Sequence, residues 1–573
     1  MTTRSLRPAI ALIVALAAPV SGQEPAEKPT VVAGRSKIAT RYGIVAASQP
    51  LAAQAGVQIL ERGGNAVDAA IAANAVMALV EPHYNGIGGD LFAIYYEART
   101  GKLYGLNAGG WAPAGLTPEF LKARGIARLS GIHTVTVPGA VAGWDAMRTR
   151  FGKLPMADLM APAIYYANEG FPVTDVIADY WAGGAARLAA EPLAAETFLP
   201  NGRAPRAGEI FKNPRLAGTL RLIAQKGAAG FYEGKTADAI VAISRVKGGA
   251  MTLADLKEYK PEWVDPISTT YRGWTVYELP PNTQGIAALM MLNIMERFPI
   301  AEYGFQTTST VHVEIEAKKL AYADMIRYVA DPHFSNVPVA PLLSKEHGAE
   351  RARLIDPRKA ACDVQPSRLT GLTTSAGGDT IYLSTIDRDG NIVSLIQSLY
   401  SSFGSGIVAP DTGVMLHNRG ALFTLEPGHP NLLGGRKRPL TTLVPAFMSK
   451  GDVKIGFGIM GGFNQAQAHA QFVSNVADFG LDVQEALEAG RFTKIPFDGC
   501  DVDVEVLIPA KTRSELEALG HEVTVIPQRT GVFGYGQAVM RDGAGVHFAG
   551  SEPRHDGEAI PEAPPVFGPA RRP

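Results

Sequence analysis

Residues 373–396 read TTSAGGDTIYLSTIDRDGNIVSLI, and the character of the chain changes within this short stretch. Small, flexible residues up to Gly378 give way to a β-prone run at 380–386. A turn at 387–391 contains Asp-Gly and leads into a second β-prone run at 392–396. Two such runs around an Asp-Gly turn predict a β-hairpin, with Thr380 at the start of its first strand.

Thr380 would be a nucleophile if it became the first residue of a chain. An N-terminal threonine carries both a hydroxyl nucleophile and its own α-amine as the base, which is one of the few ways to activate a threonine. An internal Thr380 would first have to attack the carbonyl of Asp379, and an N-to-O acyl shift followed by ester hydrolysis would release it. The hairpin taken alone favours a simpler interpretation, an inert strand.

The chain before this hairpin is predicted to be rich in helices. One helix is expected at Pro50–Glu61 and ends at a Gly-Gly pair, and Asn65 is placed to cap a second at Ala66–Val80. A glycine turn at 84–90 then leads into a strand at 91–96. The remaining helices are expected at about 157–170, 214–230, 284–296, 308–329, 465–479, 482–490 and 513–519, and further strands at 522–526 and 535–541.

Length and composition restrict the class of protein. A chain of 573 residues suggests several domains or one large multilayer domain. Hydrophobic residues make up 46% and charged residues only 19%, which excludes disorder driven by charge. Lys and Arg number 54 against 55 Asp and Glu, so there is no electrostatic footprint for a polyanion and we expect no nucleic-acid partner.

Residues 1–22 are predicted to be a secretory signal peptide, cleaved after Gly22. Two arginines and no acid precede an apolar run at 9–20, which small residues follow. An uncleaved anchor is the alternative, but this run is too short to span a bilayer comfortably and no other stretch is long enough. We therefore expect a periplasmic or secreted protein that is not membrane-bound after signal removal. An oxidising compartment permits a disulfide between Cys362 and Cys500, but free thiols are the expected state.

A dinucleotide-binding motif is a competing interpretation. Residues 456–461 match G-x-G-x-x-G between a short β-prone segment and a helix. The segment at 482–489 predicts another helix, however, so the second strand of a βαβ unit is missing. What remains is a Gly461-Gly462 turn between a strand and a helix, where backbone amides can hold an oxyanion or carboxylate.

Metal and cofactor sites find little support in the sequence. Residues 312–316 do not match H-E-x-x-H and the two cysteines lie far apart, so a polar face of one helix is the favoured interpretation. There is no G-x-S-x-G elbow, and 401–406 is best read as a serine and glycine loop. We expect no metal and no cofactor.

A set of short motifs occurs in the order seen in γ-glutamyltranspeptidases, and the chain resembles that family from about Gly34 to Gly557. The motifs are 84–89 (YNGIGG), 137–140 (VPGA), 280–285 (PPNTQG), 379–380 with 387–391 (DT and DRDGN), 403–407 (FGSGI), 436–442 (RKRPLTT) and 460–462 (MGG). The resemblance implies an N-terminal-nucleophile hydrolase of the α+β class with a four-layer αββα sandwich. It also implies a precursor that cuts itself into a helix-rich large subunit, 23–379, and a small catalytic subunit, 380–573, which form a heterodimer.

The resemblance also implies which residues of this sequence take part in the reaction. It implies that Asp379–Thr380 is the self-cleaved bond and Thr380 the nucleophile, with Ser398 in place of a supporting threonine. Gly461 and Gly462 match the oxyanion-hole glycines. Thr441 and Thr442 replace a serine pair that contacts the substrate carboxylate. The implied enzyme is an autoprocessed amide hydrolase or acyltransferase, similar to glutathione hydrolases, which works through an acyl-enzyme on Thr380.

The residues that recognise a glutamyl group depart from the family. Gly109 stands where the family has an arginine, and Tyr400 replaces an asparagine. Arg419 and Leu422 stand where it has an amide and an aspartate for the α-amino group. Losing a carboxylate that pairs with a desolvated ammonium costs ~2 to 5 kcal/mol. Arg419 would instead favour an acyl group that ends in a carboxylate. This pattern of substitutions resembles the acylase-like branch of the family.

Several functions therefore remain open. The substrate is expected to be a small-molecule amide or peptide, either a γ-glutamyl compound such as glutathione or a non-glutamyl amide such as a glutaryl amide. A non-catalytic periplasmic binding protein that kept the fold, and a nucleotide-dependent enzyme, are the alternatives from other classes.

Overall fold

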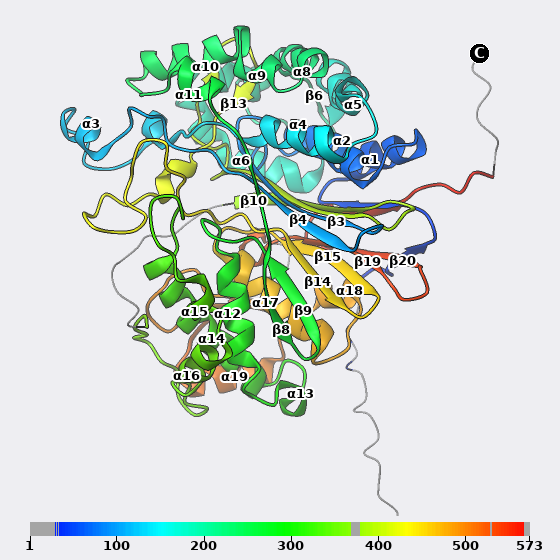
Figure 1. Ribbon diagram of the computed structural model, residues 1–573, viewed down its shortest axis with the longest axis vertical. Helices are drawn as coiled ribbons and strands as arrows, with labels where there is room; N and C mark the ends of the chain where they lie inside the picture. The colour runs from blue at the N-terminus through cyan, green and yellow to red at the C-terminus, as the bar shows by residue number, and fades with distance from the viewer. Residues whose placement is uncertain (1–28, 30, 32–33, 368–378, 528–529, 567–573) are drawn as a thin grey trace, which may run out of the picture.

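The computed structural model describes residues 29, 31, 34–367, 379–527 and 530–566, with only the backbone of Asp379. The predicted signal peptide at 1–22 and the small residues at 373–378 lie outside the described residues. Two seven-stranded antiparallel sheets face each other and helices cover both outer faces, as Figure 1 shows. This arrangement confirms the four-layer αββα sandwich.

The first sheet is built around the predicted hairpin. β10 and β11 pair antiparallel from Ile386 opposite Ile392, which confirms the hairpin. The strand order is β21 (Glu558–Pro561), β2 (Ile44–Ala47), β10 (Asp379–Ile386), β11 (Ile392–Tyr400), β3 (Asp90–Glu97), β4 (Lys102–Ala108) and β7 (Glu262–Val264).

The second sheet draws on both ends of the chain and on its middle. Its strand order is β1 (Ile38–Thr40), β20 (His547–Ser551), β19 (Gly536–Arg541), β15 (Val453–Ile459), β14 (Ala446–Lys450), β9 (Trp274–Glu278) and β8 (Ile267–Tyr271). Each sheet therefore mixes strands from before and after Thr380.

The helices form the two outer layers (Figure 1). Asn65 caps α2 through a reciprocal pair of hydrogen bonds with Asp68, as the sequence predicts. Those covering the first sheet include α1 (Pro50–Glu61), α2 (Ala66–Val80), α4 (Ala140–Phe151), α5 (Met156–Glu169), α8 (Pro214–Lys226), α9 (Ala229–Tyr232) and α10 (Lys235–Val246). Those covering the second include α12 (Gly285–Met295), α14 (Thr308–Tyr328), α16 (Lys345–Ala352), α17 (Asn464–Ala477) and α18 (Val483–Glu488).

Glycines in β15 let the two sheets approach closely. A Cβ on Gly458 would lie 2.4 Å from the ring of Tyr382 in β10, and one on Gly456 would lie 2.5 Å from Ile392. β15 runs antiparallel to both of its neighbours, β14 and β19, so it is not part of a βαβ unit. The G-x-G-x-x-G match therefore reflects sheet packing and not dinucleotide binding.

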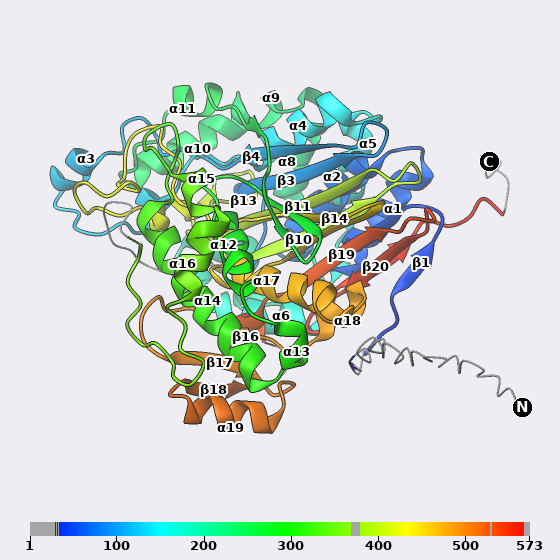
Figure 2. The same cartoon turned by 60° about the horizontal axis from the view of Figure 1, so that its bottom comes forward.

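A small third sheet lies at one end of the molecule beside α19 (Ala510–Ala518), as Figure 2 shows. It consists of β16 (Phe492–Thr493), β17 (Asp501–Glu505) and β18 (Glu522–Ile526). Next to it, Cys362 and Cys500 form a disulfide with their Cα atoms 4.7 Å apart. The expectation of free thiols is wrong, because a hydrogen bond from the Gly499 amide to the Cys362 carbonyl, 2.9 Å, brings the two segments together.

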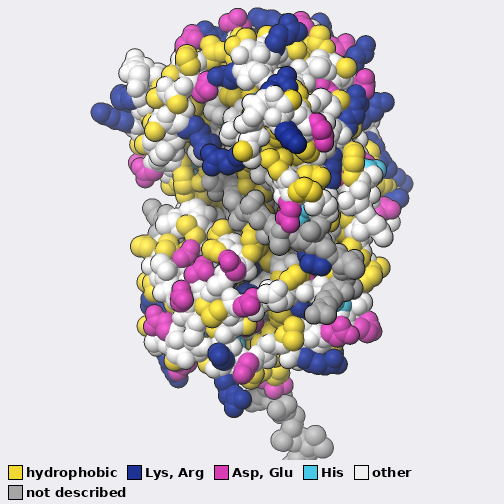
Figure 3. Space-filling model, turned by 90° about the vertical axis from the view of Figure 1, so that its left-hand side faces the viewer, with side chains coloured by type: hydrophobic (Ala, Val, Ile, Leu, Met, Phe, Trp, Pro, Cys, Tyr) yellow, Lys and Arg dark blue, Asp and Glu magenta, His cyan; other side chains and the backbone are white. Residues whose placement is uncertain are grey.

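None of the described helices has the length and the apolar character needed to cross a membrane. On the face drawn in Figure 3, acidic and basic side chains are interspersed over both halves. The described residues of this face thus offer no broad basic area for a polyanion.

Candidate active site

Thr380 is held at an irregularity in the first sheet. Asp379 pairs with Tyr400 and Ile381 with Gln397, so Ser398 and Leu399 both lie opposite Thr380. Such a bulge re-aims side chains and is common beside active sites. Thr380 is fully buried, and its hydroxyl accepts a hydrogen bond from Gln465 Nε2 at 3.2 Å.

Ser398 and Tyr400 shape the strand opposite the threonine. The Ser398 hydroxyl accepts a hydrogen bond from the Tyr400 amide at 2.6 Å. Tyr400 has a φ of 78°, in the left-handed region that non-glycine residues rarely adopt. Strain of this kind persists only where the surroundings impose it, and it is concentrated at functional sites.

The glycine pair lies between β15 and α17. Gly461 has a φ of 126° and Gly462 a φ of 60°, so any side chain there would be strained. Gln284 Nε2 donates to the carbonyl of Gly462 at 2.7 Å and to that of Thr442 at 2.6 Å. The Gly461 and Gly462 amides make no hydrogen bond to a described residue, so both are available to an oxyanion.

A glutamine links this glycine pair to the nucleophile. The Gln465 amide donates to the Gly462 carbonyl at 3.3 Å, while its side chain donates to Thr380. The same side chain accepts from the Val444 amide at 3.2 Å through its Oε1, which fixes the orientation of the amide group. Thr380, Gly462 and the segment after Thr442 thus form one connected site.

Arg419 lies buried at the start of the short 3₁₀ helix η3 (Arg419–Leu422). Its Nη1 donates to Thr442 Oγ1 at 3.0 Å, and its guanidinium lies 4.8 Å from the centre of the Tyr400 ring. Its Nε donates to Asp90 Oδ2 at 3.2 Å. Nη2 has no hydrogen-bond partner within the described part of the chain. The structure thus brings together the predicted residues Arg419, Tyr400 and Thr442.

Both the amide and the hydroxyl of Thr441 make hydrogen bonds to the backbone. Its amide donates to the Asn282 carbonyl at 2.9 Å, and its hydroxyl accepts from the Leu443 amide at 3.4 Å. Thr441 therefore fixes the path of the chain next to Thr442.

Asp90 is a buried residue beside Arg419 that the sequence did not reveal. Its Oδ1 accepts from the Gly110 amide at 2.8 Å, and its Oδ2 lies 3.1 Å from His417 Nδ1 and 3.2 Å from Arg419 Nε. Burial alone would raise the pKa of Asp90, but His417, Arg419 and the Gly110 amide outweigh it and lower the pKa. A buried carboxylate thus balances the charge of Arg419.

Gln284 and Gln465 were also not singled out. Gln284 directly precedes Gly285 and Gln465 follows Gly462 by three residues, so the sequence places both beside backbone turns. The signal that could have revealed them is chemical, because an amide side chain can donate and accept at once and join two backbone segments.

Neither Gly109 nor Leu422 offers a charged side chain. A Cβ on Gly109 would lie 2.7 Å from the Phe92 ring, so the backbone passes too close for a longer side chain. Leu422 is buried and offers no charge. Both observations agree with the departures inferred from the sequence.

A cleft of about 800 Å³ reaches Gly461, the first glycine of the pair. Its lining residues include Gly461, Phe463, Tyr84, Asp179 and Tyr180. The last two come from α6 (Asp175–Ala189), so the walls are built from both sides of Thr380 along the chain.

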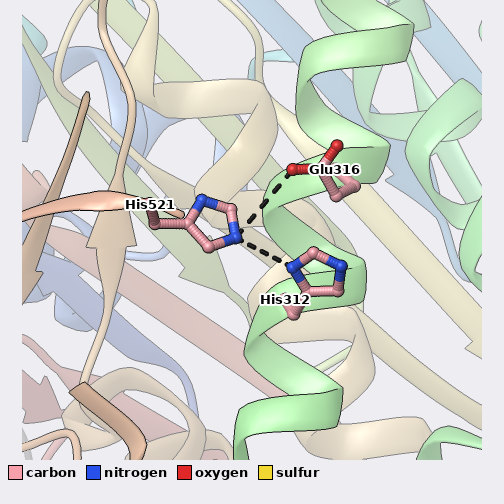
Figure 4. Close-up of side chains that lie close together, drawn as sticks. All are labelled: His312, Glu316 and His521. Atoms are coloured by element: carbon pink, nitrogen blue, oxygen red, sulfur yellow. Dashed lines mark hydrogen bonds and ion pairs between the residues drawn. The ribbon is translucent and has the colours of Figure 1, made fainter. Parts of the chain in front are cut away.

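A second cluster, away from this site, joins His312, Glu316 and His521 (Figure 4). His312 Nε2 faces the Asp356 carbonyl at 2.8 Å and must donate to it, so its Nδ1 accepts from His521 Nε2 at 2.8 Å. Glu316 Oε1 accepts from Lys319 at 2.7 Å. The expected polar helix face is therefore a buried set of contacts between α14 and the turn before β18.

We interpret this cluster as a set of hydrogen bonds and not as a metal centre. Burial, followed by the charge of Lys319, lowers the pKa of His521 to about 3. A divalent cation there would face Lys319 and would have to break the bond between the two imidazoles.

Known proteins resemble this chain closely. A family model described as gamma-glutamyltranspeptidase matches residues 52–562. The glutathione hydrolase-like YwrD proenzyme of Bacillus subtilis (strain 168) is 37% identical over 533 residues, which cover 92% of this chain and 99% of the relative. The oxamate amidohydrolase proenzyme of Klebsiella pneumoniae is 34% identical over 528 residues, 90% of this chain and 98% of the relative.

A solved structure agrees with these relatives. Cephalosporin acylase from Bacillus halodurans superimposes with a TM-score of 0.86 and 43% sequence identity, over 95% of this chain and 98% of that one. These relatives are named as enzymes, which disfavours the non-catalytic alternative. The chain therefore belongs to the γ-glutamyltranspeptidase family, the autoprocessed amide hydrolases and acyltransferases that use an N-terminal nucleophile.

Proposed function

We propose that Thr380 is both the residue that cuts the precursor and the nucleophile of the mature enzyme. Its hydroxyl attacks the Asp379 carbonyl, the C–N bond breaks as the acyl group moves to oxygen, and water hydrolyses the ester. The products are a large subunit ending at Asp379 and a small subunit beginning at Thr380, which form a heterodimer. The buried hydroxyl beside Gln465 and the glycine pair supports this assignment.

The freed α-amine of Thr380 then serves as the base. It takes the hydroxyl proton as the oxygen attacks the substrate amide, and the amides of Gly461 and Gly462 stabilise the oxyanion. The amine leaves with a proton, and water or a second amine takes the acyl group from Thr380. One oxyanion donor is worth ~10²- to 10³-fold in kcat, or about 2.7 to 4 kcal/mol.

We propose further that the acyl group ends in a carboxylate bound by Arg419. The observation that carries this proposal is Arg419 Nη2, which is buried and has no partner within the described part of the chain. An arginine fork suits a carboxylate, and a buried donor without a partner is costly until a ligand satisfies it. Thr442 lies within reach of the same guanidinium.

Among the described residues, Asp90 is the only acid that contacts Arg419, so the ammonium of a γ-glutamyl substrate bound there would have no other carboxylate. Both oxygens of Asp90 are already occupied, by Gly110 on one side and by His417 and Arg419 on the other. Leu422 replaces the family aspartate. Two relatives are named for substrates other than glutathione, a cephalosporin and oxamate, and oxamate carries a carboxylate next to its amide. These points favour the acylase-like alternative.

We place the enzyme in the periplasm or outside the cell. The predicted signal peptide at 1–22 supports this location, and the disulfide between Cys362 and Cys500 fits an oxidising compartment.

Thr380→Ala tests the processing step. Wild type should give a small band of 194 residues, about 20 kDa in proportion to the 60.7 kDa of the whole chain, and its Edman sequence should begin Thr-Ile-Tyr-Leu. Thr380→Ala should remain a single, inactive chain, because alanine has no hydroxyl. Thr385→Ala removes another buried threonine of β10 and should still be cut. Any other N-terminus in active protein contradicts the assignment.

A panel of glutaryl and γ-glutamyl anilides tests the acyl group. We expect kcat/KM for glutaryl anilide to be at least equal to that for γ-glutamyl anilide. We expect Arg419→Gln to narrow the difference between these two kcat/KM values. Arg297→Gln, at an exposed arginine, is the control. A hundredfold preference for γ-glutamyl anilide, about 2.7 kcal/mol in transition-state binding, would refute the carboxylate-ended acyl group and favour glutathione-like substrates.

A further inference from the structure

The disulfide joins two cysteines on opposite sides of the proposed cleavage point. Cys362 precedes Thr380 and Cys500 follows it, 138 positions after Cys362. We propose that processing turns this bond into a covalent link between the large and small subunits. The inference rests on the proposed cleavage at Asp379–Thr380.

The pairing is supported by the backbone on both sides of each cysteine. The Gly499 amide donates to the Cys362 carbonyl and the Glu522 amide to the Cys500 carbonyl, each at 2.9 Å. The Ala360 amide donates to the Leu519 carbonyl at 2.8 Å. The Gly499 and Ala360 bonds join segments before Thr380 to segments after it, and the chain contains no third cysteine that could compete.

Side chains reinforce the same corner of the molecule. His312 of α14 bonds to His521, and the neighbouring Lys318 donates to the Pro496 carbonyl at 3.1 Å. In each pair one residue lies before Thr380 and the other after it. The disulfide is thus embedded in contacts between the future subunits.

The folded subunits do not need the bond to stay together. β10 of the small subunit lies between β2 of the large subunit and β11, and β11 in turn pairs with β3. Both sheets would have to come apart before the subunits could separate. The bond therefore matters most in the unfolded state.

Cleavage changes the effect of the disulfide on the unfolded state. In the precursor it closes a long loop and reduces the entropy of the unfolded chain. The cut falls inside that loop and opens it. Without the bond, unfolding of the processed protein would release two independent chains, which gain translational and rotational freedom. With the bond, unfolding remains a unimolecular event.

Denaturing gels of the purified, active protein test the link, with free thiols alkylated before denaturation. Wild type should run as one band without reductant and as bands of about 38 and 20 kDa with it. Cys500→Ser and the matched Cys362→Ser should give two bands in both conditions. Two bands for unreduced wild type would overturn the link but leave processing intact. One band in both conditions would refute processing, and the inter-subunit link with it.

Unfolding at two protein concentrations gives an independent readout. A hundredfold dilution should leave the denaturation midpoint of the processed wild type unchanged. In Cys500→Ser it should lower the midpoint, because dissociation favours the unfolded chains by about 2.7 kcal/mol per hundredfold dilution. Equal concentration dependence in the two proteins would also overturn the proposal.

Discussion

Asp90→Asn should strongly destabilise the protein while changing its shape very little. Asparagine keeps the size of the side chain and can still accept from Gly110, but it leaves buried Arg419 without its carboxylate and removes the carboxylate that faces His417 Nδ1. Removing one member of a buried ion pair costs about 3 to 5 kcal/mol, because the remaining charge stays desolvated and unpaired. We expect a loss of this size at pH 7.

The dependence on pH distinguishes lost charge pairing from lost packing. The folded protein lowers the pKa of Asp90, so the stability that the carboxylate contributes is present above the pKa of the unfolded chain, about 3.9. It is lost as pH falls through the lower, folded pKa. The gap between wild type and Asp90→Asn should therefore be constant from pH 6 to 8 and shrink below about pH 4.

The measurement is denaturant unfolding in a Thr380→Ala background, so that every variant is a single chain. Asp265→Asn, at an exposed aspartate, serves as the control and should shift stability by less than about 0.5 kcal/mol. A loss below about 1 kcal/mol for Asp90→Asn, or a gap that persists unchanged at pH 3, would show that Asp90 does not balance Arg419.

Two further stability predictions use other parts of the fold. Burial, followed by repulsion from Asp478, raises the pKa of Glu314 to about 8, so stability is full below the unfolded pKa and declines as pH rises toward 8. In denaturant titrations, the free energy of unfolding of Glu314→Gln should match that of wild type near pH 4 and exceed it by up to about 4 kcal/mol at pH 7.5. An equal effect at both pH values would exclude a buried neutral acid at this position. Gly458→Ala should lose about 1 to 3 kcal/mol because its Cβ meets Tyr382, while the control Gly183→Ala, in an open part of α6, should be neutral or slightly stabilising; similar melting temperatures for the two would argue against close sheet packing.

Local patterns predicted the elements with clear boundaries. The cap at Asn65 and the Asp-Gly turn after Ile386 define α2 and the hairpin, and both are found where expected. The helix expected at 214–230 is instead broken at Gly227, which has a φ of 60°. α6 was missed because it presents much of its surface to solvent and buries only a narrow stripe. α10 was missed although it buries six of its twelve residues.

Only the site residues that belong to sequence motifs could be predicted. The family resemblance supplied Thr380 and the glycine pair, but Asp90 is the first residue of β3 and meets Arg419 across 329 positions of sequence. The disulfide was missed for the same reason. A pairing between distant segments depends on tertiary contacts that no local pattern records.

The mixing of strands from both sides of Thr380 has a consequence for quality control. Gln465, Gly462 and Thr380 come together only when both sheets have formed, so a chain that folds wrongly lacks the groups that would cut it. Neither product chain carries a complete sheet, and mixing separately made halves should not restore activity. Self-cleavage would then depend on correct folding, since only a molecule that has assembled both sheets can cut itself and become active.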